Sequence, residues 1–121
     1  MVKSIVLCKR PEGMALEEFR AWWLGPHTES VLAQGGPQMD RLTYSFIVAP
    51  GPNSPPWENG EPPYDVISEL WVKDRSAFDE TYRGLRSGGE MYQVIDHTRI
   101  RLPLVAEEHI VFDKISGQGS S

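Results

Sequence analysis

The sequence contains a single cysteine, Cys8, so it cannot form an intrachain disulfide. Chains without disulfides are typical of a reducing compartment, and we expect a cytoplasmic location. No run of residues approaches the roughly 20 consecutive apolar positions that a membrane-spanning helix needs. The first residues enter a strand pattern directly and show no signal-peptide pattern. These absences predict a cytoplasmic protein with no membrane partner.

Basic residues are also scarce. The chain has 12 Lys and Arg against 17 Asp and Glu, which gives a formal net charge of −5. Binding to nucleic acid requires clustered Lys and Arg to neutralise phosphates, so no nucleic-acid partner is expected.

The motifs of cofactor and metal chemistry are missing as well. There is no Gly-x-Gly-x-x-Gly, P-loop, Gly-x-Ser-x-Gly or Cys-x-x-Cys sequence, which argues against nucleotide, dinucleotide and serine-hydrolase chemistry. The three histidines, His27, His97 and His109, do not have the spacing of metal ligands. We therefore expect neither metal nor cofactor. A metal held by distant ligands such as Glu69, Glu107 and His109 is the weaker alternative.

Hydrophobic periodicity divides the rest of the chain into alternating strands and helices. Strands are expected at residues 3–9, 42–49, 64–73 and 103–112, and helices at 15–24, 28–34, 76–85 and 90–98. The Gly-Pro pair at 25–26 should break or kink the first helix, and Asp74 is a plausible N-cap. Residues 50–63 contain six prolines and form a long loop, either a lid or binding loop or a surface insertion.

The element order predicts an α+β fold of the ferredoxin-like βαββαβ type, a four-stranded antiparallel sheet with its helices on one face. We assign residues 1–113 to this single domain and 114–121 to a flexible tail. The strand at 64–73 is apolar on both faces, with Val66 and Leu70 on one side and Ile67 and Trp71 on the other. A sheet that is apolar on both faces needs two covers, so we expect a homodimer packed sheet against sheet.

His27 is the leading candidate for chemistry. It ends the apolar stripe of the first helix, which runs through Leu16, Phe19 and Trp23 to His27 in successive steps of three, four and four residues. An imidazole with an ordinary pKa near ~6.5 is suited to proton transfer, and this one is expected to face an apolar cavity between helix and sheet. A buried ring that only bonds main chain is the alternative.

Further candidates come from the strands and the loop. His109 and Tyr64 are proposed as catalytic partners of His27, because each could donate a hydrogen bond or a proton. Substrate-binding positions are expected at Trp23, Tyr44, Trp57, Glu69 and Trp71. For Glu69, a structural ion pair is the competing interpretation.

Four segments resemble the EthD family of the dimeric α+β barrel superfamily. They are Lys-x-Ile-Val-Leu-x-Lys-Arg at 3–10, Leu-Glu-Glu-Phe-Arg-x-Trp-Trp at 16–23 followed by His27, Tyr-Asp-x-Ile-x-Glu-Leu-Trp-Val at 64–72, and Glu-Glu-His-Ile-Val at 107–111. The resemblance implies a ferredoxin-like protomer, a sheet-to-sheet homodimer, and functional roles for His27 and His109. Superfamily activities include isomerases, polyketide cyclases and dehydratases, and cofactor-free monooxygenases.

These observations favour a cofactor-independent lyase, isomerase or polyketide cyclase that uses histidine acid–base catalysis. Its substrate would be a small apolar oxygenated ring compound such as a polyketide or lactone. The alternatives are a cofactor-free monooxygenase acting on a quinol-type substrate and a non-catalytic dimer that binds small ligands.

Overall fold

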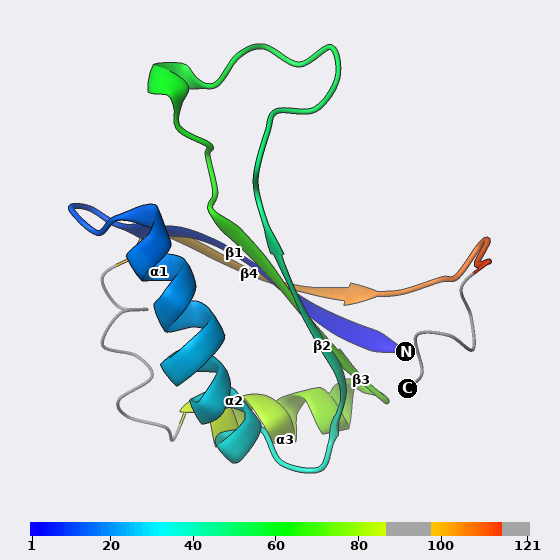
Figure 1. The fold of residues 1–121 in the computed structure, drawn as a ribbon. Coiled ribbons are helices and arrows are strands. Elements are labelled where there is room, and N and C mark those ends of the chain that lie inside the picture. The colour runs from blue at the N-terminus through cyan, green and yellow to red at the C-terminus, as the bar shows by residue number, and fades with distance from the viewer. Residues whose placement is uncertain (87–97, 115–121) are drawn as a thin grey trace.

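The computed structural model describes residues 1–86 and 98–114 of the chain, and Figure 1 shows helices packed on one side of a twisted sheet. The elements in chain order are β1 (Val2–Pro11), α1 (Leu16–Trp22), the π-helical turn η1 (Trp23–His27), α2 (Thr28–Gln34), β2 (Met39–Phe46), the 3-10 turn η2 (Glu58–Gly60), β3 (Val66–Val72), α3 (Arg75–Arg86) and β4 (Thr98–Glu107). The helix expected at 90–98 and the tail expected at 114–121 fall outside the described residues, apart from Thr98 and Lys114. No described helix has the length and apolar character needed to cross a bilayer.

The four strands form one sheet in the order β2-β3-β1-β4, and every neighbouring pair is antiparallel. The first and third strands of the chain are therefore central, which is the ferredoxin-like arrangement. The predicted fold class is confirmed.

The last strand lies five residues earlier than expected, over Thr98–Glu107 instead of 103–112. Its register with β1 runs from Pro11 paired with Thr98 to Val2 paired with Glu107. Because β1 begins at Val2, β4 has no strand to pair with beyond Glu107. Pro103 lies within the strand and does not start it, because β4 is an edge strand, where a residue without an N–H is tolerated in mid-strand.

The helices bury one face of the sheet in two adjoining clusters. The buried residues are Cys8, Phe19, Trp23 and Val66 in the first cluster, and Leu70, Val72, Ala77 and Phe78 in the second. Tyr44 and Phe46 pack against the first cluster and Leu42 against the second, so these alternate residues of β2 face the helices.

Helix α3 begins where the sequence predicts. Oδ1 of Asp74 accepts a hydrogen bond of 2.9 Å from the backbone N–H of Ala77, so the expected N-cap is confirmed. The helix buries Ala77, Phe78 and Thr81 on its sheet-facing side.

The opposite face of the sheet is also apolar along its middle. Leu7 is directly paired with Ile67 on one side and Leu102 on the other, and Ile5 is paired with Leu104. Directly paired residues project to the same face, which here is the one that the helices leave open. Leu102 and Leu104 are 41% and 44% exposed. We call these five residues the open-face patch.

Candidate active site

His27 ends a π-helical turn that joins α1 to α2. Pro26 has no N–H, so it cannot donate to the carbonyl of Trp22 as an α-helix requires. The backbone widens into a π turn instead, while Trp22, His27 and Thr28 keep right-handed helical angles. The break expected at the Gly-Pro pair is therefore a widened turn within a continuous helical path. Such turns often occur at functional sites.

The imidazole of His27 lies among aromatic rings between the helix and β2. Its ring centroid is 4.2 Å from Trp23, 4.9 Å from Trp22 and 6.2 Å from Tyr44. The residue is only 7% exposed, and its buried Nδ1 has no hydrogen-bond partner within the described ranges. Burial lowers the pKa of His27 from 6.5 to about 4, because the surroundings disfavour the charged form. The ring is therefore a neutral imidazole at physiological pH.

Tyr44 brings a hydroxyl group to this cluster. Its Oη lies 3.1 Å from Oγ1 of Thr28, which lies 2.6 Å from the carbonyl oxygen of Trp23. Thr28 has one hydroxyl proton and the carbonyl can only accept, so Thr28 donates to the carbonyl and Tyr44 donates to Thr28. Burial raises the pKa of Tyr44, which keeps its phenol protonated as a donor.

Two of the predicted site residues, Glu69 and Trp71, lie on the other face of the sheet. Tyr44 is paired with Ser68, whereas Glu69 is paired with Thr43, so Tyr44 and Glu69 project to opposite faces. The sheet therefore separates both residues from the histidine.

Glu69 and Trp71 belong instead to a charged cluster on the open face. Nζ of Lys3 lies 2.7 Å from Oε2 of Glu69 and 3.3 Å from Oε2 of Glu108. The indole N–H of Trp71 donates to Oε1 of Glu108 at 2.9 Å. Lys3 and Arg41 both lie over the Trp71 ring, 5.1 and 4.6 Å from its centroid. Glu69 therefore forms a structural ion pair with Lys3, the alternative to a substrate-binding role.

His109 lies beyond the end of β4, not on a strand as expected. Its side chain is 78% exposed and its Nε2 is 3.5 Å from Oε1 of Glu107. Tyr64 precedes β3 by two residues, four residues along the chain from the Ser68 that pairs with Tyr44. The rings that the structure places against His27 are those of Trp22, Trp23 and Tyr44, and within the described ranges neither Tyr64 nor His109 joins them.

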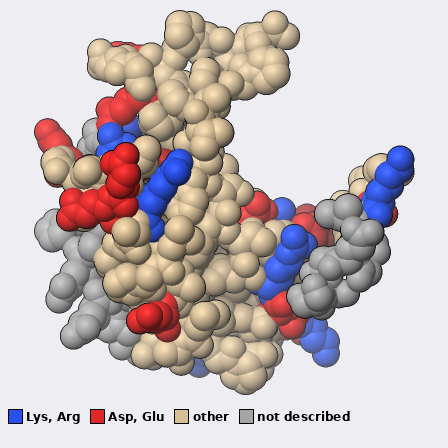
Figure 2. Space-filling model, in the orientation of Figure 1, with Lys and Arg blue, Asp and Glu red and all other residues tan. Residues whose placement is uncertain are grey.

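Trp57 lies on the Pro-rich loop, which projects from the sheet as an arm (Figure 1). Residues 48–56 are exposed and carry no charge, so the arm is tan in Figure 2. Trp57 itself is half-buried.

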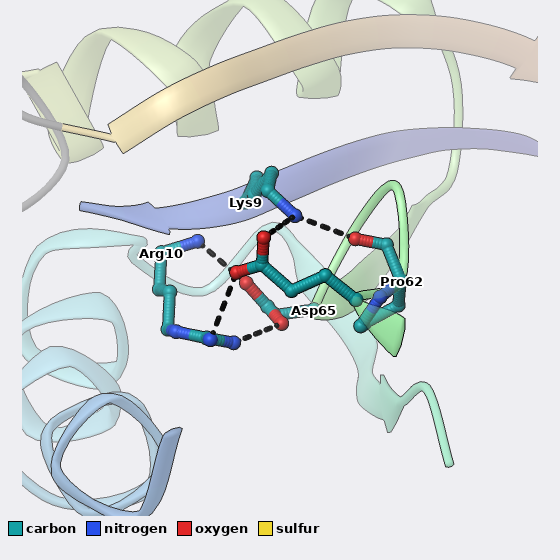
Figure 3. Close-up of polar contacts among 5 residues, drawn as sticks. Lys9, Arg10, Pro62 and Asp65 are labelled. Carbon is teal, nitrogen blue, oxygen red and sulfur yellow. Dashed lines mark hydrogen bonds and ion pairs between the residues drawn. The ribbon is translucent and has the colours of Figure 1, made fainter. Parts of the chain in front are cut away.

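A polar cluster that the sequence did not predict fixes the base of this arm to β1 (Figure 3). Asp65 is 1% exposed; it accepts hydrogen bonds from the backbone N–H of Arg10 at 2.7 Å and from the Arg10 guanidinium at 2.9 Å. Arg10 also pairs with Glu61 at 3.0 Å, and Nζ of Lys9 donates to the carbonyl of Pro62 at 2.6 Å. The partners are more than 50 residues apart, so no local pattern indicated them.

An open cavity of about 310 Å³ lies at the far end of α2 from His27. It is lined by residues 34–38 together with Glu80 and Arg83. Among residues 1–86 and 98–114, no group of three or more His, Cys, Asp or Glu side chains could hold a metal ion. A cavity beside His27 itself stays a prediction.

The sheet order and the helices on one face define the class of the protein: it has a ferredoxin-like α+β fold. Among solved structures, it is similar to an ethyl tert-butyl ether D (EthD) family protein from Bacillus halodurans. The two share 18% sequence identity with a TM-score of 0.67, over 90% of this chain and 99% of that one. The predicted resemblance to EthD proteins is thus confirmed at the level of the fold.

Two other similar structures extend the comparison. A protein from Bacteroides fragilis, described as dimeric with a ferredoxin-like fold, is 14% identical with a TM-score of 0.55, covering 88% of this chain and 95% of that one. A hydroxynitrile lyase from Passiflora edulis is 11% identical with a TM-score of 0.55, covering 93% and 96%. No protein-family profile and no curated protein matches the sequence. At these identities the likeness concerns the fold alone.

Proposed function

We propose that this protein is a cofactor-independent, cytoplasmic enzyme of the lyase, isomerase or cyclase type, in which His27 is the acid–base group. The observation that carries the proposal is the buried Nδ1 of His27, which has no partner among the described residues and is surrounded by aromatic rings. A polar atom left unpaired in an apolar interior is costly unless a ligand satisfies it. The hydroxynitrile lyase neighbour supports the proposal by showing that the fold can serve small-molecule chemistry.

The proposed step is removal of a proton next to a carbonyl group. The proton moves to Nδ1 of His27, and the C–H electron pair moves into the carbonyl, which becomes an enolate. Tyr44 turns its O–H from Thr28 toward the enolate oxygen and stabilises the developing charge. Return of the proton from His27 to another carbon gives isomerisation. Attack of the enolate carbon on a second carbonyl of the same molecule gives ring closure, and His27 then returns its proton to the new alkoxide. Loss of a group from the neighbouring carbon, protonated by His27 as it leaves, gives elimination.

The weak basicity of His27 narrows the substrate class. A base with a pKa of about 4 is poorly matched to an ordinary ketone but better matched to a carbon acid flanked by two carbonyl groups. Polyketides and related oxygenated rings contain such positions. Trp22 and Trp23, packed against the imidazole, suit a flat, mostly apolar ring.

Deuterium exchange tests this step without knowledge of the natural substrate. Benzoylacetone, a 1,3-diketone, is incubated with the protein in D2O, and loss of its central C–H signal is followed by NMR. We expect exchange above the buffer rate, loss of that excess in H27N, and its retention in H109N, the matched exposed histidine. Recovery of the diketone with no excess exchange would refute the proposed base. Binding without exchange would favour the non-catalytic ligand-binding alternative.

We also infer that two copies of the chain associate through the open-face patch. An apolar face on the second side of a sheet needs a cover, and a second copy supplies the same apolar surface. The charged cluster around Trp71 adds polar groups at one end of that face. The dimeric description of the Bacteroides fragilis neighbour supports this inference.

A further inference from the structure

Three nitrogen atoms on one side of the first helical segment are buried and have no hydrogen-bond partner among the described residues. They are Nε of Arg20, Nε1 of Trp23 and Nδ1 of His27. The residues are spaced by three and four positions along α1 and η1, so their side chains lie on one stripe. Trp23 is 1% and His27 is 7% exposed.

The stripe faces two rings of β2. The guanidinium carbon of Arg20 is 5.1 Å from the centroid of Phe46, and the Trp23 ring is 5.9 Å from that of Tyr44. Phe46 and Tyr44 are two residues apart on one strand, so they project to the same face. The side chains of Arg20, Trp23 and His27 therefore all lie at the interface between the helix and the aromatic residues of β2.

The chemistry of these nitrogens specifies what could satisfy them. The Nε–H of arginine and the Nε1–H of tryptophan can only donate, so their partner must be an acceptor. Arginine keeps its positive charge at all physiological pH values, which favours an acceptor that carries negative charge. Within residues 1–86 and 98–114, no carboxylate forms an ion pair with Arg20.

We propose that this stripe binds the carboxylate of an aromatic or ring-containing acid, with Arg20 and Trp23 donating to its oxygens and His27 lying beside the ring. The inference rests on the proposed function, since it assigns a substrate class to the same site. Arg20 is a binding residue in this scheme. The guanidinium stacked on Phe46 is held at the edge of the site, while the indole N–H lies deeper in the core.

The test compares 2-naphthoate with 2-naphthamide, an uncharged ligand of nearly the same shape, by isothermal titration with the full chain. We expect the carboxylate to bind about tenfold more tightly than the amide, since charge-assisted hydrogen bonds exceed neutral ones. This preference should disappear in R20Q and persist in R75Q, which removes an exposed arginine paired with Asp79. The indole N–H resonance of Trp23, assigned with W23F, should shift with naphthoate.

Equal affinity of the wild-type protein for the two ligands, or no binding of naphthoate, would overturn the proposal. So would an R20Q variant, folded by circular dichroism, that keeps the preference for the carboxylate. The result is separable from the proposed acid–base function, because deuterium exchange of benzoylacetone depends on His27 and does not require an acidic ligand.

Discussion

Acidification should destabilise this protein through His27. Its pKa is about 4 in the native state, against an ordinary value of 6.5. As the pH falls through 6.5, the unfolded chain takes up a proton that the native state refuses, so unfolding becomes more favourable. The stability contributed by the neutral ring is present above pH 6.5 and is lost progressively down to about pH 4, below which both states are protonated.

The size of the effect follows from the two pKa values. The free energy of unfolding should fall by about 2 kcal/mol between pH 7 and pH 5, and by about 3 kcal/mol in total below pH 4. Urea denaturation at fixed protein concentration, followed by tryptophan fluorescence, measures this slope at each pH. The variant H27L puts an apolar side chain in an apolar site. Between pH 7 and pH 5, its free energy of unfolding should fall by about 2 kcal/mol less than that of the wild-type protein.

Comparing variants separates the contribution of His27 to the pH dependence of stability from that of carboxylates, which also titrate in this range. H109Q removes a histidine whose side chain is 78% exposed and should retain the wild-type slope. A parallel NMR titration of the imidazole C–H signals should give a midpoint near 4 for His27. A wild-type slope equal to that of H27L, or a midpoint near 6.5, would refute the claim that the ring is buried and neutral.

Three further predictions concern the fold and its assembly. D65N should lower the free energy of unfolding by about 3 kcal/mol in chemical denaturation, because it breaks the buried ion pair with Arg10. D79N breaks an exposed ion pair and should lower it by less than about 0.5 kcal/mol. Similar losses in the two variants would contradict this ranking. L104E should convert a dimer to a folded monomer in light scattering, while L32E, also at an exposed leucine, should not; a dimer that survives L104E would exclude the open face. D74A should cost about 1 kcal/mol through loss of the N-cap, and an unchanged denaturation midpoint would show that the cap is dispensable.

Local sequence patterns predicted the structure well where the relevant residues lie within a few positions of one another in a single strand or helix. Leu42, Tyr44 and Phe46 are apolar or aromatic at alternate positions because β2 has one buried face. Asp74 was identifiable as an N-cap because capping involves residues only three positions apart. The stripe that ends at His27 was visible for the same reason, and Arg20 could have been placed on it by the same spacing.

The candidate site was harder to predict, because its members come from several elements. Glu69 lies on the far face of the sheet, and His109 lies beyond β4, since the register of β1 ends that strand at Glu107. The Arg10–Asp65 contact joins residues 55 positions apart, a distance at which sequence periodicity carries no information. Pairing registers decide such contacts, and a shift of one residue reverses every face.

The sequence alone determined the order of the described strands and helices and the histidine at the end of the first helical stripe. Each of these depends on periodicity and on turn chemistry within a few residues. Only the tertiary structure decided that the helix passes through its Gly-Pro pair as a π turn. This turn buries the neutral imidazole against Trp23 and leaves its Nδ1 without a partner among the described residues. The tertiary structure also separated that ring from the charged cluster on the open face. Burial and desolvation depend on every neighbour at once, so they exist only after the sheet and the helices have packed together.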